Sequence, residues 1–275
     1  MPAAVPRYRG PLRAAILDWA GTTVDFGSQA PVAVLLSIFE SRSVPVTAAE
    51  ARKPMGLHKR DHIRAICEMP EVRERWIARH GSAPSETDVE ALFAAFTPRL
   101  LQSIASHSGV IPGVPEAVAA MRARGMRIGT TTGYTRIMLD EVIPRAAQQG
   151  YSPDVSVCPE EAGGGRPLPW MCYRNAMCLQ IYPLQACVKI GDTPVDIHEG
   201  LNAGMWTIGV AATGNETGLP ERELAALSES DRRALVTSAG ERLLTAGAHY
   251  VVDSIADVEP VLDQIGLRLR DGEVP

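Results

Sequence analysis

The sequence is poor in features of membrane, secreted and zinc-binding proteins. Among its 275 residues, no apolar run approaches the roughly 20 residues that cross a bilayer. No apolar segment follows the basic residues at the N-terminus, which argues against a secretory signal. The five cysteines are odd in number and have no Cys-x-x-Cys spacing, which argues against a disulfide framework or a zinc site. We therefore expect a cytoplasmic protein with no membrane partner, in which each cysteine is a small buried side chain.

Positive charge is also scarce. Lys and Arg total 27 against 32 Asp and Glu, a formal net charge of -5, which argues against a nucleic-acid partner. Hydrophobic residues at 45% and charged residues at 21% are typical of a globular protein. The length suffices for one large domain, or for a core domain with a smaller companion.

Strand and helix patterns alternate along the second part of the chain. Helical patterns end at Gly125, Gly150 and Gly204, and a short apolar segment follows each. This alternation predicts an α/β fold with a doubly wound parallel sheet. The expected strands cover residues 14–17, 126–131, 154–158, 187–191, 205–210 and 249–252.

Residues 27–106 have helical patterns and no strand pattern. Thr47 with Glu50 and Thr87 with Glu90 have the spacing of capping boxes, and Pro54 suits the first turn of a helix that runs to Met69. This segment interrupts the strand–helix alternation after the first strand. We therefore predict an α/β core from residues 1–26 and 107–275, with an inserted α-helical cap domain over residues 27–106.

Asp18 ends the first apolar segment abruptly. Ligands of α/β proteins gather beyond the carboxyl ends of parallel strands. A carboxylate there can bind a divalent cation or attack an electrophile as a nucleophile. From this residue alone, a role as the cap of the next helix is an equal alternative.

Three further expected strand ends bear polar residues. Thr132 and Gly133 follow one strand, Arg166 lies in the loop after another, and Asp192 and Asp196 follow a third. Carboxylates with a hard cation, opposite hydroxyl and guanidinium donors, suit phosphoryl transfer. Taken singly, each of these residues is as well explained as a helix cap or a surface charge.

The order of these motifs supports a resemblance. Asp18-x-x-Gly21-Thr22, the strand-end Thr132 and Gly191-Asp192-x-x-x-Asp196 resemble the haloacid dehalogenase superfamily. More narrowly, segments 18–25, 51–57, 59–62, 131–136, 165–171 and 191–193 resemble the phosphonoacetaldehyde hydrolase family. The similarity runs from about residue 14 to the end, and it assigns no role to residues 1–12. It implies a Rossmann-like core, a homodimer, and cleavage of the P–C bond of a small phosphonate to acetaldehyde and phosphate.

Ala20 departs from the pattern of most superfamily phosphatases. They have a second aspartate at this position, which protonates the alcohol leaving group, and positioned acid–base help contributes about 10²–10⁴-fold. Alanine cannot transfer a proton. Ala20 therefore argues against the alternative function, a phosphatase or phosphomutase acting on a small phosphate ester. A catalytically silent binding protein is a third reading, against which the intact set of polar residues argues.

A lysine in the expected cap suits P–C cleavage. The leaving group is a carbanion, and an iminium between a lysine amine and an adjacent aldehyde supplies the electron sink. With a helix starting at Pro54, Met55, Lys59 and His62 fall on one face. The resemblance makes Lys59 the Schiff-base residue, with His62 transferring protons and Met55 assisting near the lysine.

The amine of Lys59 must be neutral part of the time to act as a nucleophile. We expect burial under the cap and neighbouring cations to lower its pKa. The competing lysine, Lys53, precedes a proline, so an extended conformation outside the helix is expected for it. The cations expected near Lys59 are Arg52, Lys53 and Arg60.

The resemblance also assigns the remaining site residues. Asp18 is the nucleophile and forms an aspartyl-phosphate intermediate. Mg²⁺ is held by Asp18, the main-chain carbonyl of Ala20 and Asp192, whereas Asp196 orients the loop. Asp25 has a structural role. The substrate contacts are Thr132, Gly133, Tyr134 and Arg166.

Overall fold

The computed structural model of the chain describes residues 7–275 and contains one six-stranded parallel sheet. The strand order is β3-β2-β1-β4-β5-β6, the order of a doubly wound dinucleotide-binding fold, so the predicted fold class is confirmed. The order reverses at β1, which places the carboxyl ends of β1 and β4 at the switch point where ligands bind. The strands are β1 (Ala14–Leu17), β2 (Arg127–Thr131), β3 (Val155–Val157), β4 (Cys187–Gly191), β5 (Trp206–Val210) and β6 (Tyr250–Val252).

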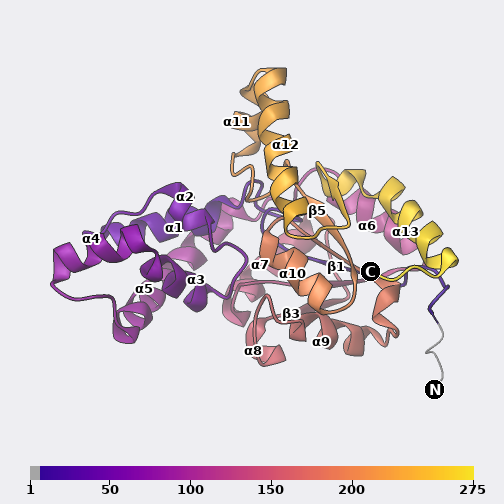
Figure 1. Cartoon of the computed structure of the whole chain (residues 1–275), viewed down its shortest axis with the longest axis horizontal. Helices are drawn as coiled ribbons and strands as arrows, with labels where there is room; N and C mark the ends of the chain where they lie inside the picture. The colour runs from indigo at the N-terminus through magenta and orange to yellow at the C-terminus, as the bar shows by residue number, and fades with distance from the viewer. Residues whose placement is uncertain (1–6) are drawn as a thin grey trace.

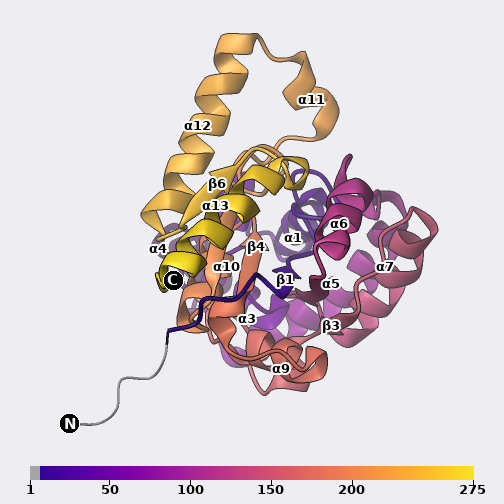
Figure 2. The ribbon, with the colours of Figure 1, turned by 90° about the vertical axis from the view of Figure 1, so that its right-hand side faces the viewer.

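Helices cover both faces of the sheet (Figures 1 and 2). The alternation of β1 shows why: Ala14 and Ile16 pack in one hydrophobic cluster with residues of α9, whereas Ala15 and Leu17 pack in another with residues of α6 and α13. All four side chains are fully buried, as expected for a central parallel strand. The core helices are α6 (Val114–Ala123), α7 (Arg136–Gln148), α8 (Pro159–Ala162), α9 (Trp170–Leu179), α10 (Pro194–Asn202), α11 (Glu221–Ala226), α12 (Glu229–Thr245) and α13 (Glu259–Asp271), with short 3-10 turns at Leu184–Ala186 and Ile255–Asp257.

A block of five helices is inserted between β1 and α6, at the left of the sheet in Figure 1. Its longest helices, α1 and α5, pack against each other. Asp25 caps α1: its carboxylate accepts from the backbone N–H groups of Gln29 and Ala30 at 3.1 and 3.0 Å. The block comprises α1 (Gln29–Glu40), α2 (Ala48–Arg52), α3 (Lys59–Glu68), α4 (Pro70–His80) and α5 (Glu86–His107). The division into cap and core domains at residues 26/27 and 106/107 stays a prediction.

The helix expected from Pro54 begins later, at Lys59. Gly56 has a φ of +91°, a left-handed conformation that a helix cannot contain. A Cβ at this glycine would lie 2.5 Å from Oγ1 of Thr193, so the preceding turn packs tightly on the core. Met55 therefore lies in a turn, outside the helix that carries Lys59 and His62. Lys53 is exposed and helical in its backbone angles, which corrects the expected extended conformation.

Two smaller expectations are also corrected. Cys178 is exposed, whereas Cys67, Cys158, Cys172 and Cys187 are buried. The last helix continues beyond the expected end near residue 265 to Asp271, where Gly272 ends it in a left-handed conformation. No helix within residues 7–275 is long and apolar enough to cross a membrane.

Candidate active site

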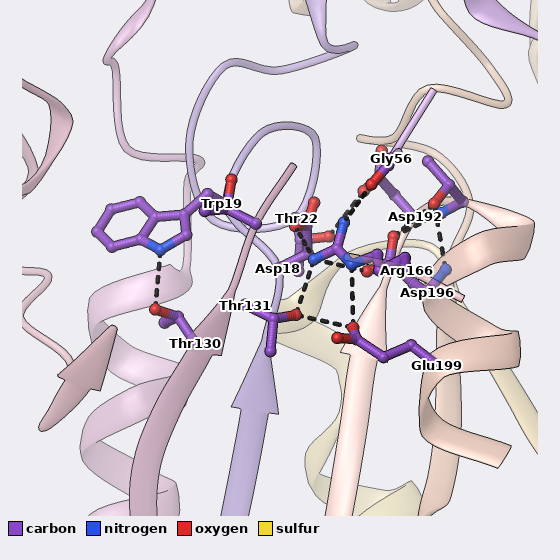
Figure 3. Close-up of polar contacts among 12 residues, drawn as sticks. Asp18, Trp19, Thr22, Gly56, Thr130, Thr131, Arg166, Asp192, Asp196 and Glu199 are labelled. Atoms are coloured by element: carbon purple, nitrogen blue, oxygen red, sulfur yellow. Dashed lines mark hydrogen bonds and ion pairs between the residues drawn. The ribbon is translucent and has the colours of Figure 1, made fainter. Parts of the chain in front are cut away.

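Asp18 follows β1 directly and extends its pairing, since its backbone N–H donates to the carbonyl of Ile190 on β4 at 2.9 Å. The residues after it form a turn, and the next helix is capped by Asp25, so Asp18 is not a helix cap. Asp18 is 5% exposed, and its carboxylate points into the group of polar side chains shown in Figure 3. The helix-cap alternative is therefore wrong, and the carboxylate is available for chemistry.

The turn after Asp18 is shaped to bring a second carboxylate close. Gly21 has a φ of +85°, and a Cβ there would lie 2.1 Å from Oδ2 of Asp192. Thr22 donates its hydroxyl hydrogen to Oδ1 of Asp192 at 3.0 Å. Trp19 anchors the turn on the sheet, with Nε1 donating to Oγ1 of Thr130 at 2.9 Å (Figure 3). Glycine at position 21 is thus required by both the backbone angle and the close approach.

Three aspartates form a buried cluster at this edge of the sheet. Carboxylate oxygens of Asp18, Asp192 and Asp196 lie within 4.8 Å of one another. Burial, and then the charges of Asp18 and Asp196, raise the pKa of Asp192 well above its usual range. The negative charges of neighbouring carboxylates repel one another. A divalent cation binds such oxygen ligands and neutralises their charge. The cluster therefore fits a divalent metal ion.

The third aspartate is already engaged. Asp196 accepts a hydrogen bond from Nζ of Lys189 at 2.7 Å and from Oγ1 of Thr193 at 2.6 Å, and it forms an ion pair with Nη2 of Arg166 at 3.0 Å. Burial opposes the charged form, but Arg166 and Lys189 together lower the pKa of Asp196. Asp196 consequently has less capacity left for a metal than Asp18 and Asp192.

Arg166 lies at the centre of this network (Figure 3). Its Nη2 donates to Oδ1 of Asp18 at 2.5 Å and to Oγ1 of Thr131 at 2.8 Å, and its Nε donates to Oε2 of Glu199 at 3.0 Å. Nη1 reaches the carbonyl of Gly56 at 3.3 Å. Burial would lower the pKa of Arg166, but the surrounding carboxylates raise it well above its usual value. The guanidinium thus touches both the nucleophile candidate and the inserted helical block.

Sequence reasoning missed three residues of the network: Thr131, Lys189 and Glu199. Lys189 is wholly buried on β4, with Nζ 2.7 Å from Asp196 and 3.5 Å from Glu199. A lysine within the otherwise apolar segment Cys187–Gly191 indicates a buried ion pair, so the sequence alone could have pointed to Lys189. Glu199 follows Asp196 by three residues on α10, a spacing that places both carboxylates on one helix face.

On the inserted helical block, Lys59 is the first residue of α3 and is 3% exposed. Its backbone N–H donates to the carbonyl of Gly133 at 3.2 Å, which fixes the helix start on the core. Its Nζ lies 3.8 Å from Sδ of Met55 and 5.3 Å from the ring centroid of Tyr134. The amine is therefore held among soft and aromatic groups, despite the later start of the helix.

Burial lowers the pKa of Lys59 to about 8. The charge of Asp18 raises this pKa, and the charge of Arg166 lowers it. The direction agrees with the expectation from sequence, but the cations named there are not the cause. Lys53 is exposed, Arg60 forms an ion pair with Glu90, and Arg52 points to main-chain carbonyls.

His62 lies one turn beyond Lys59 and is fully buried. Its Nε2 is 2.8 Å from the carbonyl oxygen of Ala51, so this nitrogen carries the hydrogen. Its Nδ1 has no hydrogen-bond partner within the described chain. Burial, and then the charge of Lys59, lower the pKa of His62 to about 3, so the ring is neutral with a free acceptor nitrogen.

The residues after β2 close the site. Oγ1 of Thr132 accepts from the backbone N–H of Tyr134 at 3.0 Å, and a Cβ on Gly133 would lie 2.2 Å from the carbonyl oxygen of Leu57. A small cavity of about 20 Å³ remains between these residues and the helical block. Of the predicted site residues, His62 and Asp192 are not among those that line this cavity. The others line it: Asp18, Ala20, Met55, Lys59, Thr132, Gly133, Tyr134 and Arg166.

Comparisons with known proteins identify the family. Residues 12–204 match the family model described as haloacid dehalogenase-like hydrolase. A phosphonoacetaldehyde hydrolase of Syntrophobacter fumaroxidans is 49% identical over 268 residues, which cover 98% of this chain and 97% of that protein. The chain belongs to the phosphonoacetaldehyde hydrolase family. The resemblance that the motifs indicated is thereby confirmed.

Further relatives agree with this family assignment. A phosphonoacetaldehyde hydrolase of Bacillus cereus is 45% identical over 254 residues, covering 92% of this chain and 96% of that protein. The crystal structure of a phosphonoacetaldehyde hydrolase-like protein from Oleispira antarctica superposes with a TM-score of 0.97 at 40% identity, covering all of both chains. As a member of this hydrolase family, the chain is an enzyme.

Proposed function

We propose that this enzyme hydrolyses phosphonoacetaldehyde to acetaldehyde and phosphate. One observation carries the proposal: Lys59, on the inserted helical block, and Asp18, at the end of β1, line the same small cavity. An amine with its pKa lowered to about 8 is neutral often enough to attack an aldehyde. Arg166 holds the carboxylate of Asp18 in the cavity, from which this carboxylate can reach phosphorus. The cavity thus pairs one nucleophile for carbon with one for phosphorus.

The first step joins Lys59 to the aldehyde. The neutral amine attacks the carbonyl carbon, and loss of water gives a protonated imine. His62 supplies Nδ1 as the group that takes and returns protons during the addition and the loss of water. Met55 lies against the Lys59 amine and holds it in place without adding charge. These roles explain why soft and neutral groups surround the lysine.

The second step breaks the P–C bond. A carboxylate oxygen of Asp18 attacks phosphorus, and the P–C electron pair moves into the iminium to give an enamine. Water hydrolyses the aspartyl phosphate, which releases phosphate and restores Asp18. Protonation of the enamine carbon and hydrolysis of the resulting imine then release acetaldehyde and restore Lys59.

A bound Mg²⁺ would supply charge neutralisation between the attacking carboxylate and the phosphonate. Asp18, Asp192 and the main-chain carbonyl of Ala20 would hold it, with Asp196 orienting the loop. Arg166 donates to the phosphonate oxygens as a planar fork, with the hydroxyl of Thr132 and the backbone at Gly133 beside it. Tyr134 shapes the aldehyde end of the cavity.

Entry of the substrate requires the helical block to move. A volume of about 20 Å³ holds little more than one water molecule, far less than the substrate needs. We therefore propose that residues 27–106 form a cap that opens to admit phosphonoacetaldehyde and closes to bring Lys59 over Asp18. The family implies a cytoplasmic homodimer, and light scattering of the purified protein would test whether it is a dimer.

Trapping with borohydride tests the function. Borohydride added with phosphonoacetaldehyde should inactivate the enzyme and leave a reduced adduct on the peptide that contains Lys59. Lys59→Met should abolish both trapping and acetaldehyde release, whereas Lys53→Met, the matched control at the exposed neighbouring lysine, should retain both. Hydrolysis of phosphate esters without any trapping would favour the phosphatase alternative, against which Ala20 argues.

A further inference from the structure

A cap arginine outside the cavity reaches across to the core. Arg52 is the last residue of α2, and its side chain is half-buried. In the core, Nη1 donates to Oδ1 of Asn215 at 3.2 Å and Nη2 donates to the carbonyl of Gly218 at 2.8 Å, while Nη1 also donates to the carbonyl of Gly27, at the start of the predicted cap, at 2.7 Å. All three acceptors are neutral oxygens. The contact is therefore specific in geometry but lacks the strong attraction of a carboxylate partner.

The core loop after β5 is shaped to receive this guanidinium. Gly218 has a φ of +70°, and a Cβ there would lie 2.8 Å from Nε of Arg52. Gly27, at the start of the predicted cap, packs on the same loop: it has a φ of +77°, and a Cβ there would lie 2.3 Å from the carbonyl oxygen of Leu219. Side chains at either glycine would occupy or distort the space that Arg52 enters.

Asn215 connects Arg52 to the aspartate cluster. Its side-chain Nδ2 donates back to the carbonyl of Arg52 at 3.3 Å, so the two residues contact each other at two points. Its backbone N–H donates to Oδ2 of Asp192 at 2.7 Å. Asn215 is 3% exposed, so these contacts are shielded from water. A single core residue thus touches the cap on one side and a candidate metal ligand on the other.

The same arginine is tied to the turn that carries the active-site lysine. The carbonyl of Arg52 also accepts from the backbone N–H of Met55 at 2.9 Å. Met55 lies in the turn between Arg52 and Lys59, so the contact of Arg52 with the core and the placement of the lysine share one carbonyl group. Opening of the cap must break the Arg52 contacts and displace this turn together.

We propose that Arg52 is a positioning residue that couples closure of the cap to cation binding at Asp192, through Asn215. Closure places Arg52 on Asn215 and fixes the backbone N–H that holds Asp192. Opening releases Asn215, and the Asp192 carboxylate loses its fixed orientation. Because coupling between sites is reciprocal, a cation at Asp192 favours the closed cap to the same extent. The inference rests on the proposed metal site and cap movement, but not on the identity of the substrate.

Binding of Mg²⁺ alone, measured by calorimetry without substrate, tests the coupling. Arg52→Met should weaken Mg²⁺ binding about tenfold, because the apparent affinity falls with the fraction of closed enzyme. Asn215→Ala keeps the backbone N–H and should weaken Mg²⁺ binding to a similar extent. The double variant Arg52→Met/Asn215→Ala should bind Mg²⁺ little more weakly than either single variant. Arg64→Met is the matched control, since Arg64 pairs with Asp61 and Glu86 inside the cap, and should bind Mg²⁺ like the unmodified enzyme.

Unchanged Mg²⁺ affinity in Arg52→Met, or full additivity of the two substitutions, would overturn the proposal. Arg52→Lys, which can reach one of the acceptors, should be intermediate, and it decides the question if the methionine variant does not fold. In turnover, KM should rise with kcat nearly unchanged, and a loss confined to kcat would contradict the coupling. If the enzyme failed to hydrolyse phosphonoacetaldehyde while the Mg²⁺ series behaved as expected, the proposed function would fail and the coupling would stand.

Discussion

The guanidinium of Arg166 lies on the carboxylate of Asp18, with Nη2 2.5 Å from Oδ1. Glu199 holds the same guanidinium through Nε at 3.0 Å. In the closed site Arg166 therefore occupies the space where an anionic group would approach Asp18. A phosphonate must draw Nη2 away from Asp18 or share it, while Glu199 keeps the arginine in place.

Arg166→Lys should lower kcat/KM by about 10² or more. A lysine supplies one point charge in place of a fork that contacts Asp18, Thr131 and Glu199 together, so two anions would face each other with less compensation. Steady-state kinetics with phosphonoacetaldehyde measures this. Arg136→Lys is the control, because Arg136 pairs with Glu161 away from the cavity. A loss of less than about threefold in Arg166→Lys would contradict the assigned role.

Lys59→Met should stabilise the protein while abolishing activity. The pKa of Lys59 falls from 10.5 to about 8 on folding, so the folded protein carries a cation that burial disfavours. At about 1.4 kcal/mol per pKa unit, removal of this group should raise the free energy of unfolding by up to about 3 kcal/mol. The unfolded state binds more protons between pH 8 and 10.5, so the gain is largest below pH 8 and disappears as the pH rises to 10.5.

Unfolding by denaturant, measured for the unmodified enzyme and for Lys59→Met at pH 7 and pH 10.5, gives this difference in the free energy of unfolding. Lys53→Met serves as the control, since an exposed lysine should leave stability unchanged at both values. The same pKa predicts that the rate of imine trapping rises with pH up to about 8 and then levels off. A trapping rate that keeps rising to the pKa of free lysine would show that the amine is not perturbed.

The strand ends were predictable from sequence because a parallel strand is a short apolar segment with an abrupt end. Asp18, Thr132 and Asp192 each follow such a segment, and all three lie at the same edge of the sheet. The order of the strands places them together without any knowledge of side-chain contacts. The order of motifs in a known family supplied their expected roles.

The buried network around Arg166 was not predictable in the same way. Its partners Glu199 and Lys189 come from the middle of a helix and the middle of a strand, where periodicity alone suggests packing. The start of α3 was misplaced because Pro54 suits a first helical turn, whereas the tertiary contact of Gly56 with Thr193 favours a tight turn there. In both cases contacts distant in sequence decided the local structure.

His62→Gln should separate a structural role of His62 from proton transfer. The glutamine amide can still donate to the carbonyl of Ala51, as Nε2 of His62 does at 2.8 Å, but it has no equivalent of Nδ1. The variant should melt like the unmodified enzyme, yet form the imine about 10²–10⁴-fold more slowly. Stopped-flow trapping and thermal melts measure the two properties. If glutamine retained the rate, His62 would have only a structural role.

The pH profile provides a second measurement for His62. Burial and the charge of Lys59 lower its pKa to about 3, so the ring is neutral throughout the working range. The fall in activity below pH 8 should therefore follow Lys59 alone, with no second inflection near pH 6.5, the usual pKa of histidine. NMR of the ring protons should show no titration of His62 above about pH 5. Titration of His62 near pH 6.5 would contradict its burial beside Lys59.

Ala20→Asp should exchange one activity for another. Ala20 lines the cavity two residues after Asp18. An aspartate there can protonate an alcohol leaving group and should raise the activity on small phosphate esters by about 10²–10⁴-fold. Cleavage of the phosphonate should fall, because a carbanion leaving group gains little from this acid and the new charge adds to the cluster of Asp18 and Asp192. Ala20→Asn, of similar size but unable to give up a proton, is the control. A gain in phosphatase activity with asparagine, or none with aspartate, would show that alanine at this position does not set the choice of reaction.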